Sequence, residues 1–251
     1  MKKSIFLFAI LVSLFSCSKN EDDPTPAKTY DIKGYYQGTL GNGAAEAGFK
    51  IAMVIEENGK VTFINYFKYN GSTADEIYYG TYTLSGNQIT ITSSRLSSPF
   101  AVNFTGTFDS ATGKLSGSWT NENNYTGKFS INKNITGKDN ITGYWKGSYM
   151  GIGGTTKYSY CMIVENDGTC SISNNQDGGF TGATISTAYG NYSLGNNVFS
   201  CFIRYEYGTS GIKYSLKANN NTTDGKLMDG TWGSENSYTD GGTWTMTKMY
   251  Y

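Results

Sequence analysis

The chain carries one strand-rich segment twice, and this repetition limits the folds that it can adopt. Residues 34–40 read Gly-Tyr-Tyr-Gln-Gly-Thr-Leu, and residues 143–149 read Gly-Tyr-Trp-Lys-Gly-Ser-Tyr. The correspondence continues to Lys133 in the first copy and to Lys248 in the second. The additional residues of the second copy fall in polar, glycine-rich positions, which are typical of turns. Because 251 residues suffice for two ordinary domains, we expect one folding unit from each copy.

Composition and turn spacing both indicate strands. The sequence has 32 glycines, 21 tyrosines and only 3 prolines, which favours an all-β protein with many tight turns. The strands predicted in the first copy span 33–40, 49–56, 60–68, 76–84, 88–95, 100–108, 114–121 and 125–132. Asn58-Gly59 and Asp167-Gly168 are expected to form type I′ hairpin turns. Each copy is thus predicted to be an eight-stranded antiparallel up-and-down barrel, which leaves no sheet edge.

Side-chain alternation assigns to each copy an inward face on which glycine alternates with large side chains. In the first, seventh and eighth strands this face comprises Gly34, Tyr36, Gly38 and Leu40; Leu115, Gly117 and Trp119; Gly127, Phe129 and Ile131; Gly143, Trp145, Gly147 and Tyr149; Met228, Gly230 and Trp232; and Gly242, Trp244 and Met246. Barrel closure makes these three strands neighbours. Tyr36, Trp119 and Phe129 are therefore expected to meet inside one barrel. Trp145, Trp232 and Trp244 are expected to meet inside the other.

The opening Gly143-Xaa-Trp145 of a first strand, with eight antiparallel strands after it, resembles the lipocalin-like barrels, a grouping that extends to avidin-like ones. The resemblance covers both copies and implies barrels that carry ligands. We assign the first barrel to 31–133, a linker to 134–139 and the second barrel to 140–251. A pair of β-sandwich modules is the main alternative, because the same alternation permits it.

The N-terminus has the features of a bacterial lipoprotein leader. Lys2 and Lys3 precede the apolar run 5–15, which is too short to span a bilayer permanently, so residues 1–16 are predicted to be a signal peptide. Leu14-Phe15-Ser16-Cys17 resembles a lipobox, which implies that Cys17 carries the acyl chains, such as palmitate. Residues 17–30 are then a disordered tether. Its acidic run 21–23 is similar to the surface-export signal of Bacteroidota-type lipoproteins, which implies an outer-membrane anchor facing the cell exterior.

Several classes of function are disfavoured. The chain has no histidine, which excludes Ser-His-Asp and Cys-His catalysis and imidazole-based zinc sites. We predict neither a metal ion nor a cofactor, and no enzymatic activity. Nucleic-acid binding is not expected either, because 20 basic residues balance 20 acidic ones without a basic stripe. Glu56 and Glu165 occupy equivalent positions beside hairpin turns and are interpreted as solvated strand ends rather than as a glycosidase pair.

Cys161, Cys170 and Cys201 remain once Cys17 is lipidated. With Asp167-Gly168 as a two-residue turn, Cys170 would lie opposite Glu165 and Cys161 opposite Asn174. That register places Cys161 and Cys170 too far apart for a disulfide. Buried free thiols are therefore predicted.

The aromatic trios are the best candidates for a binding site, since ring faces stack on sugars and line apolar pockets. Structural plugging of a small barrel would explain the same residues. The leading hypothesis is a lipid-anchored cell-envelope protein that binds a small apolar molecule or a glycan in or at the mouth of a barrel. The alternative is a non-catalytic accessory subunit of an outer-membrane complex whose barrels are filled, and a hydrolase is a distant third. We place the predicted ligand site in the second copy, which has the three tryptophans.

Overall fold

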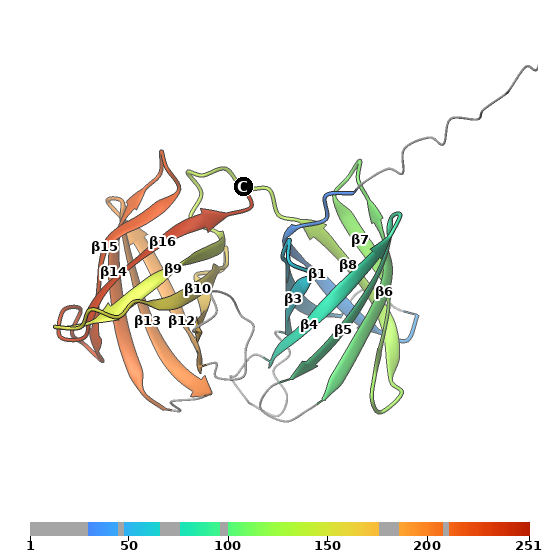
Figure 1. Ribbon diagram of the computed structural model, residues 1–251, viewed down its shortest axis with the longest axis horizontal. Helices are drawn as coiled ribbons and strands as arrows, with labels where there is room; N and C mark the ends of the chain where they lie inside the picture. Colours follow the sequence, from blue (N-terminus) through green and yellow to red (C-terminus); the bar gives the residue numbers. More distant parts are fainter. Residues whose placement is uncertain (1–29, 45–47, 66–75, 96–99, 176–185, 208–210) are drawn as a thin grey trace, which may run out of the picture.

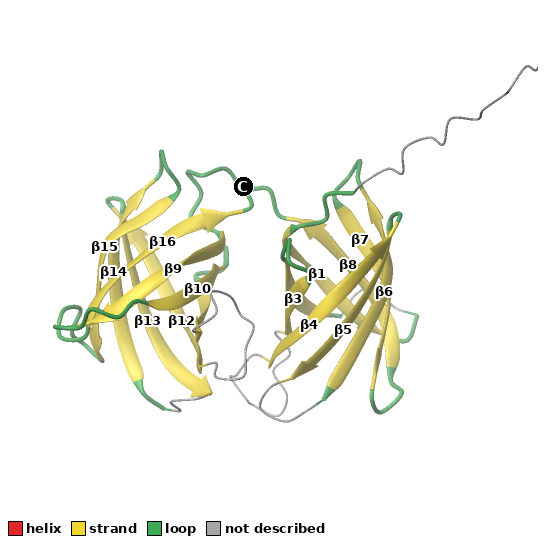
Figure 2. Cartoon of the chain, in the orientation of Figure 1, coloured by secondary structure: helices red, strands yellow, loops and turns green. Residues whose placement is uncertain are grey.

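The computed structural model describes residues 30–44, 48–65, 76–95, 100–175, 186–207 and 211–251. These residues form two closed, eight-stranded antiparallel barrels that follow one another along the chain (Figures 1 and 2). The predicted fold class is confirmed, and the β-sandwich alternative is wrong. The predicted signal peptide, Cys17 and nearly all of the tether lie outside the described residues.

All sixteen strands follow the sequence order around their barrels. The first barrel consists of β1 (Gly34–Asn42), β2 (Phe49–Ile55), β3 (Lys60–Asn65), β4 (Glu76–Ser85), β5 (Gln88–Arg95), β6 (Ala101–Asp109), β7 (Lys114–Asn121) and β8 (Thr126–Lys133). The second consists of β9 (Gly143–Gly151), β10 (Tyr158–Val164), β11 (Thr169–Asn175), β12 (Ser186–Gly195), β13 (Val198–Tyr207), β14 (Lys213–Asn221), β15 (Lys226–Ser234) and β16 (Gly242–Met249).

Each barrel closes where its first strand pairs with its last. Gly38 lies opposite Ile131 on β8, and Gly147 lies opposite Met246 on β16. At both positions a Cβ atom would collide with the backbone of the last strand, at the carbonyl oxygen of Ser130 or of Thr245. Only glycine allows so close an approach, and this explains why glycine recurs between the rings of the inward rows.

The turns after β2 and β10 differ from the prediction. The backbone N–H of Glu56 donates to the carbonyl of Lys60, and that of Glu165 donates to the carbonyl of Thr169, each at 2.9 Å. These pairs enclose three-residue loops that end in Gly59 and Gly168, whose φ angles are +79° and +87°. The two-residue type I′ prediction is therefore wrong, because the left-handed glycine here completes a longer loop. Cys170 consequently lies opposite Val164, and Cys161 opposite Ser173.

The inward assignment of Met228 is also wrong. β15 carries a β-bulge between Leu227 and Gly230, so that one additional residue enters the strand. The bulge turns Leu227 into the core and leaves Met228 with an exposed fraction of 37%. Asp229, within the bulge, adopts a φ of +52°. Strand alternation recovers beyond it, with Trp232 partly buried against the core.

The two barrels pack against each other through their outer faces, with β1 and β3 on the side that faces β10 (Figure 1). The buried members of this contact are Tyr35, Ala52, Val54, Ile64 and Ile77 from the first barrel, and Tyr144, Cys161 and Ile163 from the second. β2 is in consequence buried on both faces from Ile51 to Ile55. β10 is likewise buried from Tyr160 to Val164.

Two tyrosine–glutamate hydrogen bonds cross this inter-barrel contact in opposite directions. The hydroxyl of Tyr35 donates to Oε1 of Glu165 at 2.8 Å, and the hydroxyl of Tyr144 donates to Oε1 of Glu56 at 3.1 Å. Tyr35 and Tyr144 occupy equivalent positions in the two copies, and so do Glu56 and Glu165. The exposed fractions of Glu165 and Glu56 are 0% and 9%, so their interpretation as solvated strand ends is wrong. A carboxylate can remain there because it is hydrogen-bonded and paired.

Each of the two glutamates also has a cationic partner. Lys50 lies 3.1 Å from Glu165, and Lys146 lies 3.1 Å from Glu56. The amide of Gln37, which is the counterpart of Lys146, donates to Glu165 as well. For Lys50, burial alone would lower the pKa, but the charges of Glu165 and Asp167 outweigh it and raise the pKa. The contact between the barrels is therefore apolar at its centre and ionic at its ends.

Candidate ligand-binding cavity of the first barrel

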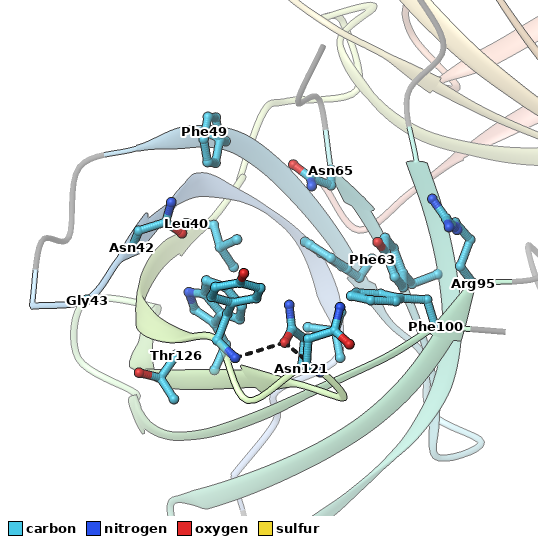
Figure 3. Close-up of a pocket in the computed structure, with 15 residues that line it drawn as sticks. Leu40, Asn42, Gly43, Phe49, Phe63, Asn65, Arg95, Phe100, Asn121 and Thr126 are labelled. Atoms are coloured by element: carbon cyan, nitrogen blue, oxygen red, sulfur yellow. Dashed lines mark hydrogen bonds between the residues drawn. The ribbon is translucent and has the colours of Figure 1, made fainter. Parts of the chain in front are cut away.

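A cavity of about 800 Å³ occupies the end of the first barrel at which β1, β3, β5 and β7 finish (Figure 3). Its apolar lining residues are Leu40, Phe49, Phe63, Tyr78, Phe100, Val102, Trp119 and Tyr125. Its polar lining residues are Asn42, Asn65, Arg95, Asn121, Asn123 and Thr126. A volume of this size lies within the range of about 300–1,000 Å³ that small-molecule sites occupy.

Phe63 and Tyr78 form the floor of this cavity, and further aromatic rings support them from within the core. The ring centroid of Phe63 lies 5.1 Å from that of Tyr78 and 5.0 Å from that of Phe104. Phe104 in turn meets Phe129 edge to face, with the centroids 5.3 Å apart. These rings come from β3, β4, β6 and β8, so the floor joins strands from around the barrel. Edge-to-face packing of this kind fixes the ring positions and gives the cavity a defined lower limit.

Trp119 provides part of the cavity wall. Its Nε1 donates to the carbonyl of Gly41 at 2.8 Å. The neighbouring strand carries Gly127 directly opposite, where a Cβ atom would overlap the indole. The glycine and the hydrogen bond together hold the indole in place while its surface contributes to the cavity.

Polar side chains gather at the rim. Oδ1 of Asn121 accepts hydrogen bonds from the backbone N–H groups of Asn123, at 3.1 Å, and Tyr125, at 3.0 Å, which shapes the turn that edges the opening. Figure 3 shows Asn42 and Thr126 on one side of the opening and Arg95 with Phe100 on the other. The guanidinium carbon of Arg95 lies 5.8 Å from the centroid of the Phe100 ring. The cavity is thus apolar at depth and polar at its entrance.

The three candidate residues of the first barrel lie at different levels of it. Trp119 lines the cavity, whereas Tyr36 and Phe129 belong to the core without reaching the lining. The hydroxyl of Tyr36 donates to the carbonyl of Ile32 at 2.6 Å, at the opposite end of the barrel. Phe129 supports the floor through Phe104. Only Trp119 of this predicted trio is therefore placed to touch a ligand in the cavity.

The mouth of the second barrel is occupied by aromatic rings. The centroid of Tyr149 lies 5.2 Å from that of Tyr160, and the centroid of Trp232 lies 5.2 Å from that of Tyr214. Tyr205 meets Tyr214 at 5.7 Å. In the first barrel the equivalent positions hold Leu40, Ile51, Trp119, Val102 and Arg95. At three of these positions an aliphatic side chain of the first barrel, Leu40, Ile51 or Val102, is replaced in the second barrel by a tyrosine that helps to fill the mouth.

The three candidate tryptophans of the second barrel lie at separate levels as well. Trp145 and Trp244 are buried in its core, and Trp232 packs against that core from the mouth. Nε1 of Trp145 donates to the carbonyl of Ile141 at 2.8 Å, as Tyr36 does to Ile32 in the first barrel. Nε1 of Trp244 donates to the carbonyl of Thr231 at 2.9 Å. Trp244 also borders a smaller cavity of about 480 Å³ beside the β15 bulge.

The predicted inward face comprises residues of the first, seventh and eighth strands alone, so it does not include Phe63, Tyr78 and Phe100, which lie on or beside β3, β4 and β6. The alternation of Val61, Phe63 and Asn65 along β3 carries the same signal. The cavity itself could have been suspected by comparing the two copies position by position. Leu40 against Tyr149 and Val102 against Tyr214 show where one barrel has lost side-chain volume.

In the described part of the chain, no group of three or more histidine, cysteine, aspartate or glutamate side chains is placed to hold a metal ion. Nor do those residues include a helix long and apolar enough to cross a membrane. A scan against protein-family models finds no model that matches, and a search of curated proteins finds no match either. Function is therefore inferred from the geometry of the cavity.

Proposed function

We propose that this protein is a non-enzymatic binding protein of the cell envelope that holds a small apolar molecule in the cavity of its first barrel. The observation that carries the proposal is the cavity of about 800 Å³ with its ring-lined floor. Transfer of apolar surface from water into such a space is favourable by about 25 cal/mol per Å². A preformed floor also reduces the entropy lost when the ligand binds.

The distribution of polar groups favours one class of ligand. Asn42, Asn65 and Arg95 are at the rim, whereas Phe63 and Trp119 lie in the apolar part. A molecule with an apolar body and one polar end would match both regions. A glycan would need hydrogen-bond partners along its whole length, so we favour the apolar ligand over the sugar.

The proposed location rests on the leader and on Cys17. Acylation of Cys17 would anchor the protein in the outer membrane, and the acidic tether would direct it to the cell exterior. A barrel on a tether could take up an apolar molecule near the membrane without leaving the surface. The membrane is thus a partner through the lipid alone.

A variant that copies the second barrel into the first tests the binding proposal. Leu40→Tyr/Val102→Tyr introduces the residues found at the equivalent positions 149 and 214, where a barrel of the same design accommodates them. We expect the wild type to bind the fluorescent apolar probe anilinonaphthalene sulfonate saturably. The double variant should fold, as judged by circular dichroism, and lose this binding.

Equivalent substitutions in the second barrel control for effects outside the cavity. Tyr149→Phe/Tyr214→Phe changes the same level of the second barrel and should leave probe binding unchanged. Trp119→Phe should weaken probe binding roughly five-fold, which corresponds to about 1 kcal/mol, and the equivalent Trp232→Phe should not. Undiminished binding in the folded Leu40→Tyr/Val102→Tyr variant would show that the probe binds elsewhere and would contradict the proposal.

The accessory-subunit alternative is favoured by one observation on the second barrel. Its mouth is filled by rings, and apolar side chains near that mouth are exposed, with Ile152 at 73% and Tyr238 at 38%. A filled barrel that presents such residues suits contact with another envelope protein. Ile152→Asp/Tyr238→Asp should then reduce retention of an outer-membrane partner while leaving probe binding intact. Unchanged retention of the partner would contradict the accessory-subunit alternative and leave the ligand-binding proposal as the better account.

A further inference from the structure

Two thiols meet inside the second barrel. The predicted buried free thiols are confirmed for Cys161, Cys170 and Cys201. Sγ of Cys170 and Sγ of Cys201 are 2.9 Å apart in the core of the barrel. Cys170 is on β11 and Cys201 is on β13, the two strands that flank β12. The separation exceeds the length of a disulfide bond by only about 0.9 Å.

A glycine leaves the space in which the thiols meet. Cys170 lies opposite Gly190 on β12, and Cys201 lies opposite Tyr192, two residues further along the same strand. Both cysteines and Gly190 are on the inward face. Because Gly190 has no side chain, the two cysteine side chains can reach over β12 toward each other.

The first barrel shows that the fold itself does not require these thiols. Val61 and Ile91 occupy the positions equivalent to Cys170 and Cys201, with Gly80 between them. Both are buried apolar residues. The second barrel thus has cysteine at two positions that are distant in sequence but adjacent in space. Cys161, by contrast, faces the inter-barrel contact, where its sulfur lies 3.6 Å from the hydroxyl of Tyr144.

We propose that Cys170 and Cys201 form an intrachain disulfide that links β11 to β13 across the interior of the second barrel. Closing the remaining gap requires β11 and β13 to shift toward each other on either side of β12, and Gly190 adds no side chain between the two sulfurs. The proposal rests on the proposed location outside the cytoplasm, because that compartment supplies disulfide oxidants.

The oxidation is a thiol–disulfide exchange with a protein or small-molecule disulfide of the envelope. The thiolate of one cysteine attacks the oxidant, a mixed disulfide forms, and the first oxidant sulfur leaves as a thiolate. The thiolate of the other cysteine then displaces the second oxidant sulfur and closes the Cys170–Cys201 bond. Two electrons pass to the oxidant and the two thiol protons are released. Burial raises the pKa of the Cys201 thiol well above its ordinary value, so the exchange belongs to the stage before the barrel closes.

Refolding the full chain tests the pair independently of where the cell places the protein. The Cys17→Ser chain is denatured under reducing conditions and refolded in detergent with mixed oxidised and reduced glutathione. It is then denatured again, alkylated and digested for mass spectrometry. We expect Cys161 to be alkylated without reduction, and a Cys170–Cys201 linked peptide to disappear on reduction. Full alkylation of Cys170 and Cys201 without reduction, or a linkage through Cys161, would overturn the proposal.

A stability measurement with a matched variant completes the test. Reduction of the refolded protein should lower Tm by roughly 5–10 °C, because the bond restrains the unfolded chain. Cys170→Val/Cys201→Ile copies the first barrel and should fold with a Tm that reductant does not change. Equal sensitivity of this variant to reductant would contradict the assignment of the bond. Alkylation of the protein in intact cells separates the disulfide proposal from the proposed location outside the cytoplasm. If Cys170 and Cys201 form a disulfide on refolding but are reduced in cells, the result contradicts the proposed location alone.

Discussion

At the scale of single residues, the least predictable feature is the burial of Glu56 and Glu165. A carboxylate beside a hairpin turn has the sequence signature of an exposed strand end. Its burial depends on a tyrosine in the other repeat, 130 positions away for Glu165 and 88 positions away for Glu56, that donates a hydrogen bond to it. Trp119 could be assigned to the barrel interior from alternation alone. Its position at the cavity could not, because that depends on the size of Leu40 and Val102.

The buried tyrosines predict a loss of stability at high pH. Burial, reinforced by the charge of Glu165, raises the pKa of Tyr35 well above its ordinary value, and burial with Cys161 and Glu56 does the same for Tyr144. A pKa raised in the folded state contributes stability that is present below the unfolded value of about 10 and is lost above it. The free energy of unfolding should therefore fall as the pH rises beyond about 10.

Urea denaturation over a pH series measures this effect. Tyr35→Phe/Tyr144→Phe should lose about 1–3 kcal/mol per site at neutral pH, since each buried glutamate loses a donor. Its decline above pH 10 should be shallower than that of the wild type, by up to about 1.4 kcal/mol per pH unit for each tyrosine removed. Parallel pH curves for the two proteins would mean that these phenols do not control the alkaline transition.

At the scale of elements, the strands were predictable because alternation and turn glycines recur in both copies. The turn type and the β15 bulge were not. A single left-handed glycine fits either a two-residue or a three-residue loop, and a bulge leaves alternation intact on both sides of itself. One signal for the bulge exists in the sequence: Leu115 and Gly117 are separated by one residue, whereas Leu227 and Gly230 are separated by two.

The backbone at Asp229 provides a test of the bulge. Its φ of +52° is tolerated by aspartate, favoured by glycine and unfavourable for a β-branched residue. Asp229→Gly should keep or raise the free energy of unfolding by up to about 1 kcal/mol, and Asp229→Val should lower it by about 1–2 kcal/mol. Urea denaturation of both variants measures the difference. A valine variant as stable as the glycine variant would place the extra residue elsewhere in the strand.

At the scale of the whole molecule, the contact between the barrels was the main omission. Its signal is the unbroken apolar run Ile51-Ala52-Met53-Val54-Ile55. A strand with one solvent-exposed face alternates apolar and polar residues, whereas a strand buried on both faces is apolar throughout. The strand at 49–56 was predicted, but its burial on both faces was not. The closed barrels could be predicted from the repeat and its inward-facing residues. The association of the barrels depends on outward-facing side chains, which that pattern does not describe.

A charge placed in this contact should destabilise both barrels. Val54→Asp puts a carboxylate at a buried outward position of β2, at a cost of about 3–5 kcal/mol. Three of the four tryptophans are in the second barrel, so fluorescence-detected melting reports mainly on it. That melting temperature should fall in Val54→Asp and stay unchanged in Thr90→Asp, where the side chain is exposed on β5. A fall seen only by calorimetry would indicate that the barrels unfold independently.

The reciprocal tyrosine–glutamate hydrogen bonds have the form of an isologous interface, in which each partner offers the same donor and the same acceptor. A chain with one barrel and both residues could associate with an identical copy of itself in this way. In the present protein the linker makes that association intramolecular, at an effective concentration of the order of millimolar, so dilution does not separate the partners. The tandem chain is thus a covalently joined pseudo-dimer. Because each half has its own sequence, the two halves can differ: the mouth of the first barrel holds a cavity, whereas aromatic rings fill the mouth of the second.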